Sequence, residues 1–153
     1  MNDPQLLSFR ATRRAIGLAV FSGLTLECTF VREVSADAAK AVESTRAFVA
    51  WALETFPTQK VLVEEPVTKD GTRARELDRA IRAELAAVHQ SVQTTAGREL
   101  LARMDRPPRV PRQELRHIAR QIWPQLLGQP CNPVALDAAV LGLFYQVSAL
   151  LNR

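Results

Sequence analysis

The chain has 153 residues, of which 47% are hydrophobic and 24% are charged, the balance of an ordinary soluble globular protein. This length suffices for one domain with a proper core, so we expect residues 1–153 to form a single domain. No apolar run is long enough to span a bilayer, and the first five residues lack the basic segment of a secretory signal. We therefore expect a cytoplasmic protein with no membrane partner.

The cysteines and histidines do not predict a metal or redox centre. Cys28 and Cys131 lie far apart and form no Cys-x-x-Cys pair, which favours reduced thiols. His89 and His117 do not supply the clustered ligands of a zinc site.

The first 34 residues predict a three-stranded antiparallel meander. Short apolar runs cover residues 5–9 and 15–21, with a polar turn between them. Residues 24–34 alternate apolar and polar side chains, the period of a strand with one buried face. The short turns favour antiparallel pairing.

A helix is predicted next, from an N-cap at Ser35 to about Phe56, where Pro57 stops it. At 100° per residue, Trp51 falls opposite the apolar stripe of this helix, on a face of small and polar residues that includes Lys40, Ser44 and Ala47. We therefore expect Trp51 to be exposed and to contact a partner, unless a loop covers it.

The remaining pattern alternates strands and helices, which predicts an α/β domain. Strands are expected at residues 60–66 and 91–94, and helices at 73–89, 97–104 and 112–127. Asn132 and Pro133 predict the start of a last helix that is apolar nearly all round.

The positive charge is concentrated late in the chain. Residues 98–120 contain seven arginines and three acidic residues, which accounts for the whole net charge of +4. A basic segment on an otherwise balanced domain predicts a polyanionic partner such as DNA or RNA, although a solvated helix face is the alternative. The expected nucleic-acid-binding residues are Arg98, Arg109, Arg112, Arg116 and Arg120.

The start of the chain resembles the RuvC-like and YqgF-like nucleases of the RNase H-like superfamily. Their second strand reads like "rriGyAv", which the segment around Gly17 resembles, and the order of elements agrees over nearly the whole chain. The resemblance implies an RNase H-like α/β fold: a mixed sheet of about five strands, beginning with the meander and flanked by helices. It also implies two magnesium ions held by acids of the first strand, the fourth strand and the last helix, where they activate a water.

Two acids of such a site are present. Residues 61–64 resemble the family's "vaiE", which points to Glu64, and residues 134–143 resemble "DAlAlAl", which points to Asp137. The alternatives are that Glu64 ends a strand in solvent and that Asp137 only complements the dipole at the helix start. A further family aspartate, three residues before Asp137, is replaced by Val134. If the chain is active, Glu64 and Asp137 are the expected metal ligands and magnesium is the cofactor; otherwise we expect none.

Arg10 stands where the family has its first aspartate. An arginine has no acceptor and stays cationic, so it cannot bind a metal ion. Either its planar fork pairs with Glu64 and Asp137 and replaces the metal by a fixed cation, or it extends into solvent.

Three functions fit these observations. We favour a catalytically degenerate RuvC-like domain that binds nucleic acid through its arginine-rich face, as part of a DNA- or RNA-processing assembly. The first alternative is an active, metal-dependent, structure-selective endonuclease similar to Holliday junction resolvases. The second is a purely structural subunit, with Trp51 anchoring a protein partner or a second copy in a homodimer.

Overall fold

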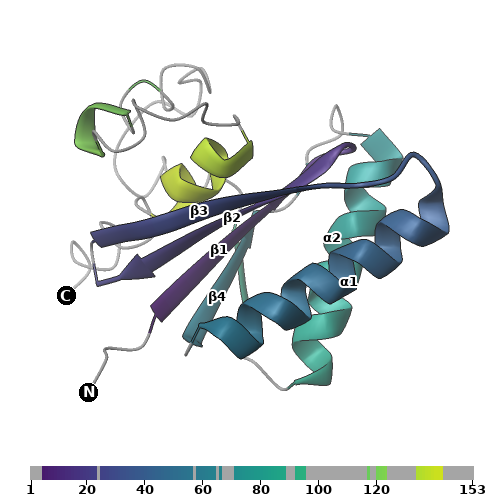
Figure 1. Cartoon of the computed structure of the whole chain (residues 1–153), viewed down its shortest axis with the longest axis horizontal. Coiled ribbons are helices and arrows are strands. Elements are labelled where there is room, and N and C mark those ends of the chain that lie inside the picture. Colours follow the sequence, from purple (N-terminus) through teal and green to yellow (C-terminus); the bar gives the residue numbers. More distant parts are fainter. Residues whose placement is uncertain are drawn as a thin grey trace.

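The computed structural model describes residues 5–23, 25–56, 58–64, 66, 71–88, 92–95, 117, 120–123 and 134–142. They form a five-stranded mixed sheet with helices on both faces (Figure 1). The strands are β1 (Gln5–Ala11), β2 (Ala15–Ser22), β3 (Thr25–Glu33), β4 (Thr58–Glu64) and β5 (Val92–Thr95).

The strand order is β3-β2-β1-β4-β5. The first three strands form the expected antiparallel meander, whereas β1–β4 and β4–β5 pair in parallel. The α/β class, the expected number of strands and the order of elements up to residue 95 are therefore confirmed; the helix expected at 97–104 and most of that at 112–127 lie outside the described residues.

Two hydrophobic layers cover the two faces of the sheet. Helices α1 (Ala38–Thr55) and α2 (Gly71–Ala87) pack on one face, and a helix of residues 134–142, yellow in Figure 1, lies on the other. Side chains of β1 alternate between the layers, as strand geometry requires: Leu7 and Phe9 join the α1–α2 core, and Leu6 packs against the core of the 134–142 helix.

The 134–142 helix approaches β2 closely because a glycine lies at each end of the contact. A Cβ atom on Gly17 would lie 2.5 Å from the carbonyl oxygen of Val134, and one on Gly142 would meet the ring of Phe21. Gly17 and Phe21 are about 13 Å apart along a strand, and Val134 and Gly142 are about 12 Å apart along a helix. The helix therefore runs along β2, with its start beside Gly17.

This close approach predicts the effect of one added methyl group. Gly17→Ala is expected to lower the free energy of unfolding by about 1–3 kcal/mol, because the nearest obstacle is backbone and the helix must shift. Urea unfolding followed by circular dichroism measures the change. A second substitution, Val134→Ala, should not rescue it, and an unchanged unfolding midpoint in Gly17→Ala would show that the helix does not pack this closely.

The structure corrects the predicted start of α1. Asp37, and not Ser35, is the N-cap: its carboxylate accepts a hydrogen bond of 3.0 Å from the Lys40 backbone N–H. The Ser35 hydroxyl oxygen instead accepts from the Asp37 N–H at 3.1 Å. Strand β1 is also longer than predicted, so that Arg10 lies within the strand rather than in the turn after it.

Candidate functional site

Arg10 and Glu64 are neighbours on the two central parallel strands. Arg10 of β1 pairs in register with Glu64 of β4 on one side and with Gly17 of β2 on the other. Residues opposite each other in a sheet point to the same face. Because Phe9 and Val63 point to the α1–α2 core, Arg10 and Glu64 point to the face that the 134–142 helix covers.

Both side chains are buried and form an ion pair. Arg10 is 4% and Glu64 3% exposed, and the guanidinium Nε lies 3.3 Å from the carboxylate Oε2. That distance defines an ion pair, although these two atoms are not aligned for a hydrogen bond. Removing two charges from water costs several kcal/mol per ion, and the opposite charge of the partner offsets part of that cost. The contact expected between Arg10 and Glu64 is present, and neither side chain extends into solvent.

Asp137 belongs to the same end of the same face. Its side chain lies in the 134–142 helix and is 4% exposed. Val134, one turn earlier, contacts the backbone at Gly17, the residue that pairs with Arg10. The first turns of this helix therefore lie over the part of the sheet that carries Arg10, and three buried charged groups share this region: one arginine and two acids.

These residues do not fit a magnesium site. Magnesium requires a nearly octahedral set of oxygen ligands. The position that should bring a first-strand carboxylate holds a guanidinium, which offers only donors. Within the described ranges, no group of three or more His, Cys, Asp or Glu side chains could hold a metal ion. Within the described residues, the opposite charges of Arg10 and Glu64 neutralise each other.

Exposed arginines lie directly beyond the cluster. The turn of residues 12–14 connects β1 to β2, and Arg13 and Arg14 are exposed at its tip. The Thr12 hydroxyl stabilises this turn by donating to the Ala15 carbonyl at 3.1 Å and accepting from the Ala15 N–H at 3.2 Å. Neither arginine forms an ion pair with a described residue. Two exposed guanidinium groups are thus held close to the end of β1.

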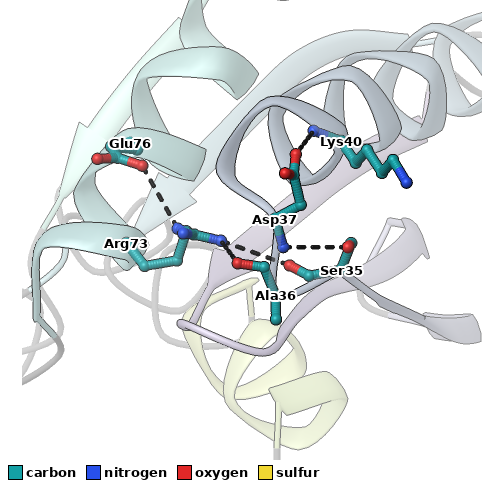
Figure 2. Close-up of polar contacts among 6 residues, drawn as sticks. All are labelled: Ser35, Ala36, Asp37, Lys40, Arg73 and Glu76. Carbon is teal, nitrogen blue, oxygen red and sulfur yellow. Dashed lines mark hydrogen bonds and ion pairs between the residues drawn. The ribbon is translucent and has the colours of Figure 1, made fainter.

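A network of contacts joins this turn to the helices. The Val34 N–H donates to the Arg14 carbonyl at 2.9 Å. Figure 2 shows the next connection, in which the Arg73 guanidinium of α2 donates to the carbonyls of Ser35 and Ala36, at 3.4 and 3.1 Å, and pairs with Glu76 at 3.4 Å. The β1–β2 turn, the start of α1 and the start of α2 are therefore fastened together at one end of the sheet.

Among the other residues predicted to be functional, Trp51 is exposed as expected, at 40%. Arg120 is half-buried, whereas Arg98, Arg109, Arg112 and Arg116 lie outside the described residues.

Sequence reasoning did not predict the burial of Trp123, which packs on Phe21 with 5.7 Å between the ring centroids. Its position three residues after Arg120 is consistent with a segment that packs on the 134–142 side of the sheet.

Cys28 is the one cysteine within the described residues, and it is a free thiol. Burial, reinforced by the charge of Glu27, raises the pKa of the Cys28 thiol. A raised pKa lowers the fraction of thiolate at neutral pH.

The fold is similar to that of RuvC and of a related resolvase. Thermus thermophilus RuvC matches it with a TM-score of 0.77 and 17% identity, over 97% of this chain and 96% of that one. T. thermophilus RuvC in complex with a Holliday junction substrate matches with a TM-score of 0.76 and 18% identity, over 97% of this chain and 96% of that one. The yeast mitochondrial Holliday junction resolvase Ydc2 matches with a TM-score of 0.66 and 9% identity, over 100% of this chain and 86% of that one. At these identities, the likeness establishes the fold.

No protein-family model matches the sequence, and no curated protein matches it in a sequence search. In the part of the chain that the structure describes, no helix is both long enough and apolar enough to cross a membrane.

Proposed function

We propose that this chain is a catalytically inactive RuvC-like domain that holds nucleic acid without cutting it, as part of a DNA- or RNA-processing assembly. The observation that carries the proposal is the buried ion pair between Arg10 and Glu64. It occupies the end of the two central strands, where the family resemblance implies a metal held by carboxylates. A fixed positive charge at that point opposes the entry of a divalent cation.

The exposed arginines support the binding half of the proposal. Arg13 and Arg14 follow the end of β1, the strand that carries Arg10. A polyanion bound at this end of the sheet, outside the buried Arg10–Glu64 pair, would therefore contact both arginines. Arginine is suited to this role because its planar fork can make two parallel hydrogen bonds to a phosphate. The arginine-rich segment of residues 98–120 adds further candidates from the sequence. Contacts of this kind confer affinity with little sequence preference.

The similarity to a RuvC solved with a Holliday junction substrate makes branched DNA the first ligand to test. Binding of a labelled four-way junction, a linear duplex and a structured RNA is measured over a range of salt concentrations. We expect nanomolar to micromolar affinity that falls steeply with salt. The double variant Arg13→Ala/Arg14→Ala should flatten the salt dependence by about one unit for each phosphate group that the variant no longer neutralises.

Arg46→Ala is the control for the loss of an arginine elsewhere: it removes one positive charge from α1, where Arg46 pairs with Glu84 at 2.9 Å. It should leave the salt slope unchanged.

The triple variant of Arg112, Arg116 and Arg120 to alanine tests the predicted arginine stripe in the same way. Failure of the parent to bind any of the three ligands at low salt would refute the proposed function, and parental binding by the triple variant would show that the stripe is only a solvated face.

A further inference from the structure

Strand β3 forms one edge of the sheet (Figure 1). It is nine residues long, and its pairing with β2 is regular over residues 28–33, beyond a register shift near Leu26. Residues 28–31, at its centre, carry no charge and are all half-buried. Edge strands of this length are commonly protected by charged side chains, by proline or by a covering segment. In the part of the chain that the structure describes, no other strand pairs with the outer side of β3.

The backbone of β3 directs hydrogen-bonding groups toward this open edge. The Val34 N–H donates to the Arg14 carbonyl at 2.9 Å, so the backbone groups of Val34 point toward β2. Successive residues of a strand point their N–H and C=O groups to opposite sides. Even-numbered residues from 28 to 32 therefore pair with β2. The residues whose backbone groups point outward, without a hydrogen bond to another described strand, are Thr29, Val31 and Glu33.

An ordered aromatic cluster lies beside the open edge. Phe30 belongs to the α1–α2 core and meets Trp51 edge-on, with 5.1 Å between the ring centroids. Trp51 also stacks on Phe48 at 5.7 Å and remains 40% exposed. A strand added to β3 would lie about 4.8 Å beyond it, so one of its faces would lie alongside Phe30. The edge thus offers both features of strand addition: backbone hydrogen bonds, and an apolar surface for alternate side chains.

The charges at the end of β3 indicate the chemistry of the partner. Arg32 and Glu33 are both exposed, and neither forms an ion pair with a described residue. Arg32 points to the same face as Phe30, whereas Glu33 points to the other face. Opposite charges directly across two strands are favourable. A complementary strand therefore carries an acidic residue opposite Arg32, a basic residue opposite Glu33, and uncharged residues opposite 28–31.

Neither a second β3 nor nucleic acid has this pattern. In a two-fold antiparallel pair of β3 strands, each residue stands opposite a residue of the same face, so Arg32 never stands opposite Glu33. Phosphate oxygens are acceptors and offer no donor to the outward carbonyls. We propose that β3 is a docking edge for a partner protein, an extended segment of which adds to it as a further antiparallel strand with the charges described above.

A synthetic peptide with blocked ends tests this edge. The probe is Lys-Glu-Val-Phe-Thr-Val, whose antiparallel alignment places its lysine opposite Glu33, its glutamate opposite Arg32 and its phenylalanine opposite Phe30. Fluorescence anisotropy of the labelled probe measures binding to the full chain, with an expected dissociation constant of about 100 μM. The control peptide exchanges lysine and glutamate and should bind about fivefold more weakly or worse, because like charges then face each other. The variant Arg32→Glu/Glu33→Arg should reverse this preference.

Methylation of the probe's backbone separates strand addition from other modes of binding. In the proposed register, the probe's first valine, opposite Val31, donates its N–H to β3, whereas the N–H of its phenylalanine points away. N-methylation of that valine should weaken binding about tenfold or more, and N-methylation of the phenylalanine about threefold or less. Trp51→Ala should weaken binding of the unmodified probe about tenfold. Arg79→Glu, at an exposed position of α2, should bind like the parent.

Hydrogen exchange of the parent chain gives a readout that needs no variant. Without the probe, the outward N–H groups of Thr29, Val31 and Glu33 should exchange faster than those of Phe30 and Arg32, and the probe should slow the first three. Circular dichroism establishes that each variant is folded. No binding at millimolar concentration, or equal effects of the two methylations, would overturn the proposal. Protection that grows with the chain's own concentration would identify a second copy as the occupant, which also overturns it. None of these measurements involves nucleic acid, so this inference and the proposed function can fail separately.

Discussion

Replacing Arg10 by alanine is expected to lower the free energy of unfolding by about 3–5 kcal/mol, one of the largest effects of any single substitution in this chain. The loss arises because the carboxylate of Glu64 stays buried, at 3% exposure, after its cation has been removed. Asp137 is a second buried acid, in the helix that covers this face. Guanidinium chloride unfolding at neutral pH measures the change.

Two comparisons separate the ion pair from general effects of truncation. Arg14→Ala removes an exposed guanidinium from the adjacent turn and should change the free energy of unfolding by less than about 0.5 kcal/mol. The double variant Arg10→Met/Glu64→Leu replaces both charges by apolar groups of similar size and should be far more stable than Arg10→Ala. If Arg10→Ala unfolds at the parent's midpoint, the buried pair does not hold β1 to β4.

The position of the candidate site follows from simple strand geometry. Side chains alternate along a strand, so Arg10 points away from the side chains of Phe9 and Ala11, and Glu64 points away from Val63. Once β1 and β4 are neighbours, their apolar residues must face the same core, and Arg10 and Glu64 must then share the opposite face. This much could be predicted from the residues, because it depends only on the period of two and on the family's order of strands.

The burial of Arg10 could not be predicted in that way. The sequence left two alternatives, an ion pair or a side chain extended into solvent. Arg10 is buried because the 134–142 helix, more than 120 residues after it in the chain, covers this face of the sheet. Its close approach depends on Gly17 and Gly142, whose missing side chains leave the room that Val134 and Phe21 occupy. Such a long-range steric fit has no signature in the local sequence pattern.

Local competition explains why the start of α1 was misplaced. Ser35 and Asp37 both accept hydrogen bonds well at an N-cap. Asp37 takes that role because its carboxylate reaches the Lys40 N–H, while the hydroxyl of Ser35 satisfies the Asp37 N–H just outside the helix. The exposure of Trp51 was predictable from helical periodicity, but its support by Phe30 was not, because that contact joins a strand to a helix.

We expect that magnesium neither activates nor stabilises the parent chain. With magnesium or manganese present, the parent chain should cut neither linear duplex DNA, nor a four-way junction, nor structured RNA. The melting temperature of the parent chain should be the same with magnesium as with a chelator. The reason is the guanidinium of Arg10, 3.3 Å from the Glu64 carboxylate, which replaces the negative charge that the family resemblance implies at that point. In a poorly solvated site, that charge acts directly against a divalent ion.

Arg10→Asp reverses this charge and should make stability depend on metal. The substitution changes the cluster by about two charge units and leaves three acids on one buried face, which repel one another and lower the melting temperature when no divalent ion is present. Magnesium or manganese should restore part of that loss, as a ligand that binds only the folded state does. Full nuclease activity is not expected to return, because Val134 stands where the family has a further aspartate.

Arg10→Asn, which removes the cation without adding an acid, is the control, and metal should raise its melting temperature less than that of Arg10→Asp. Cleavage by the parent that disappears in Glu64→Gln and Asp137→Asn would show that the cluster works as a metal site despite Arg10, and the proposal of an inactive domain would be wrong.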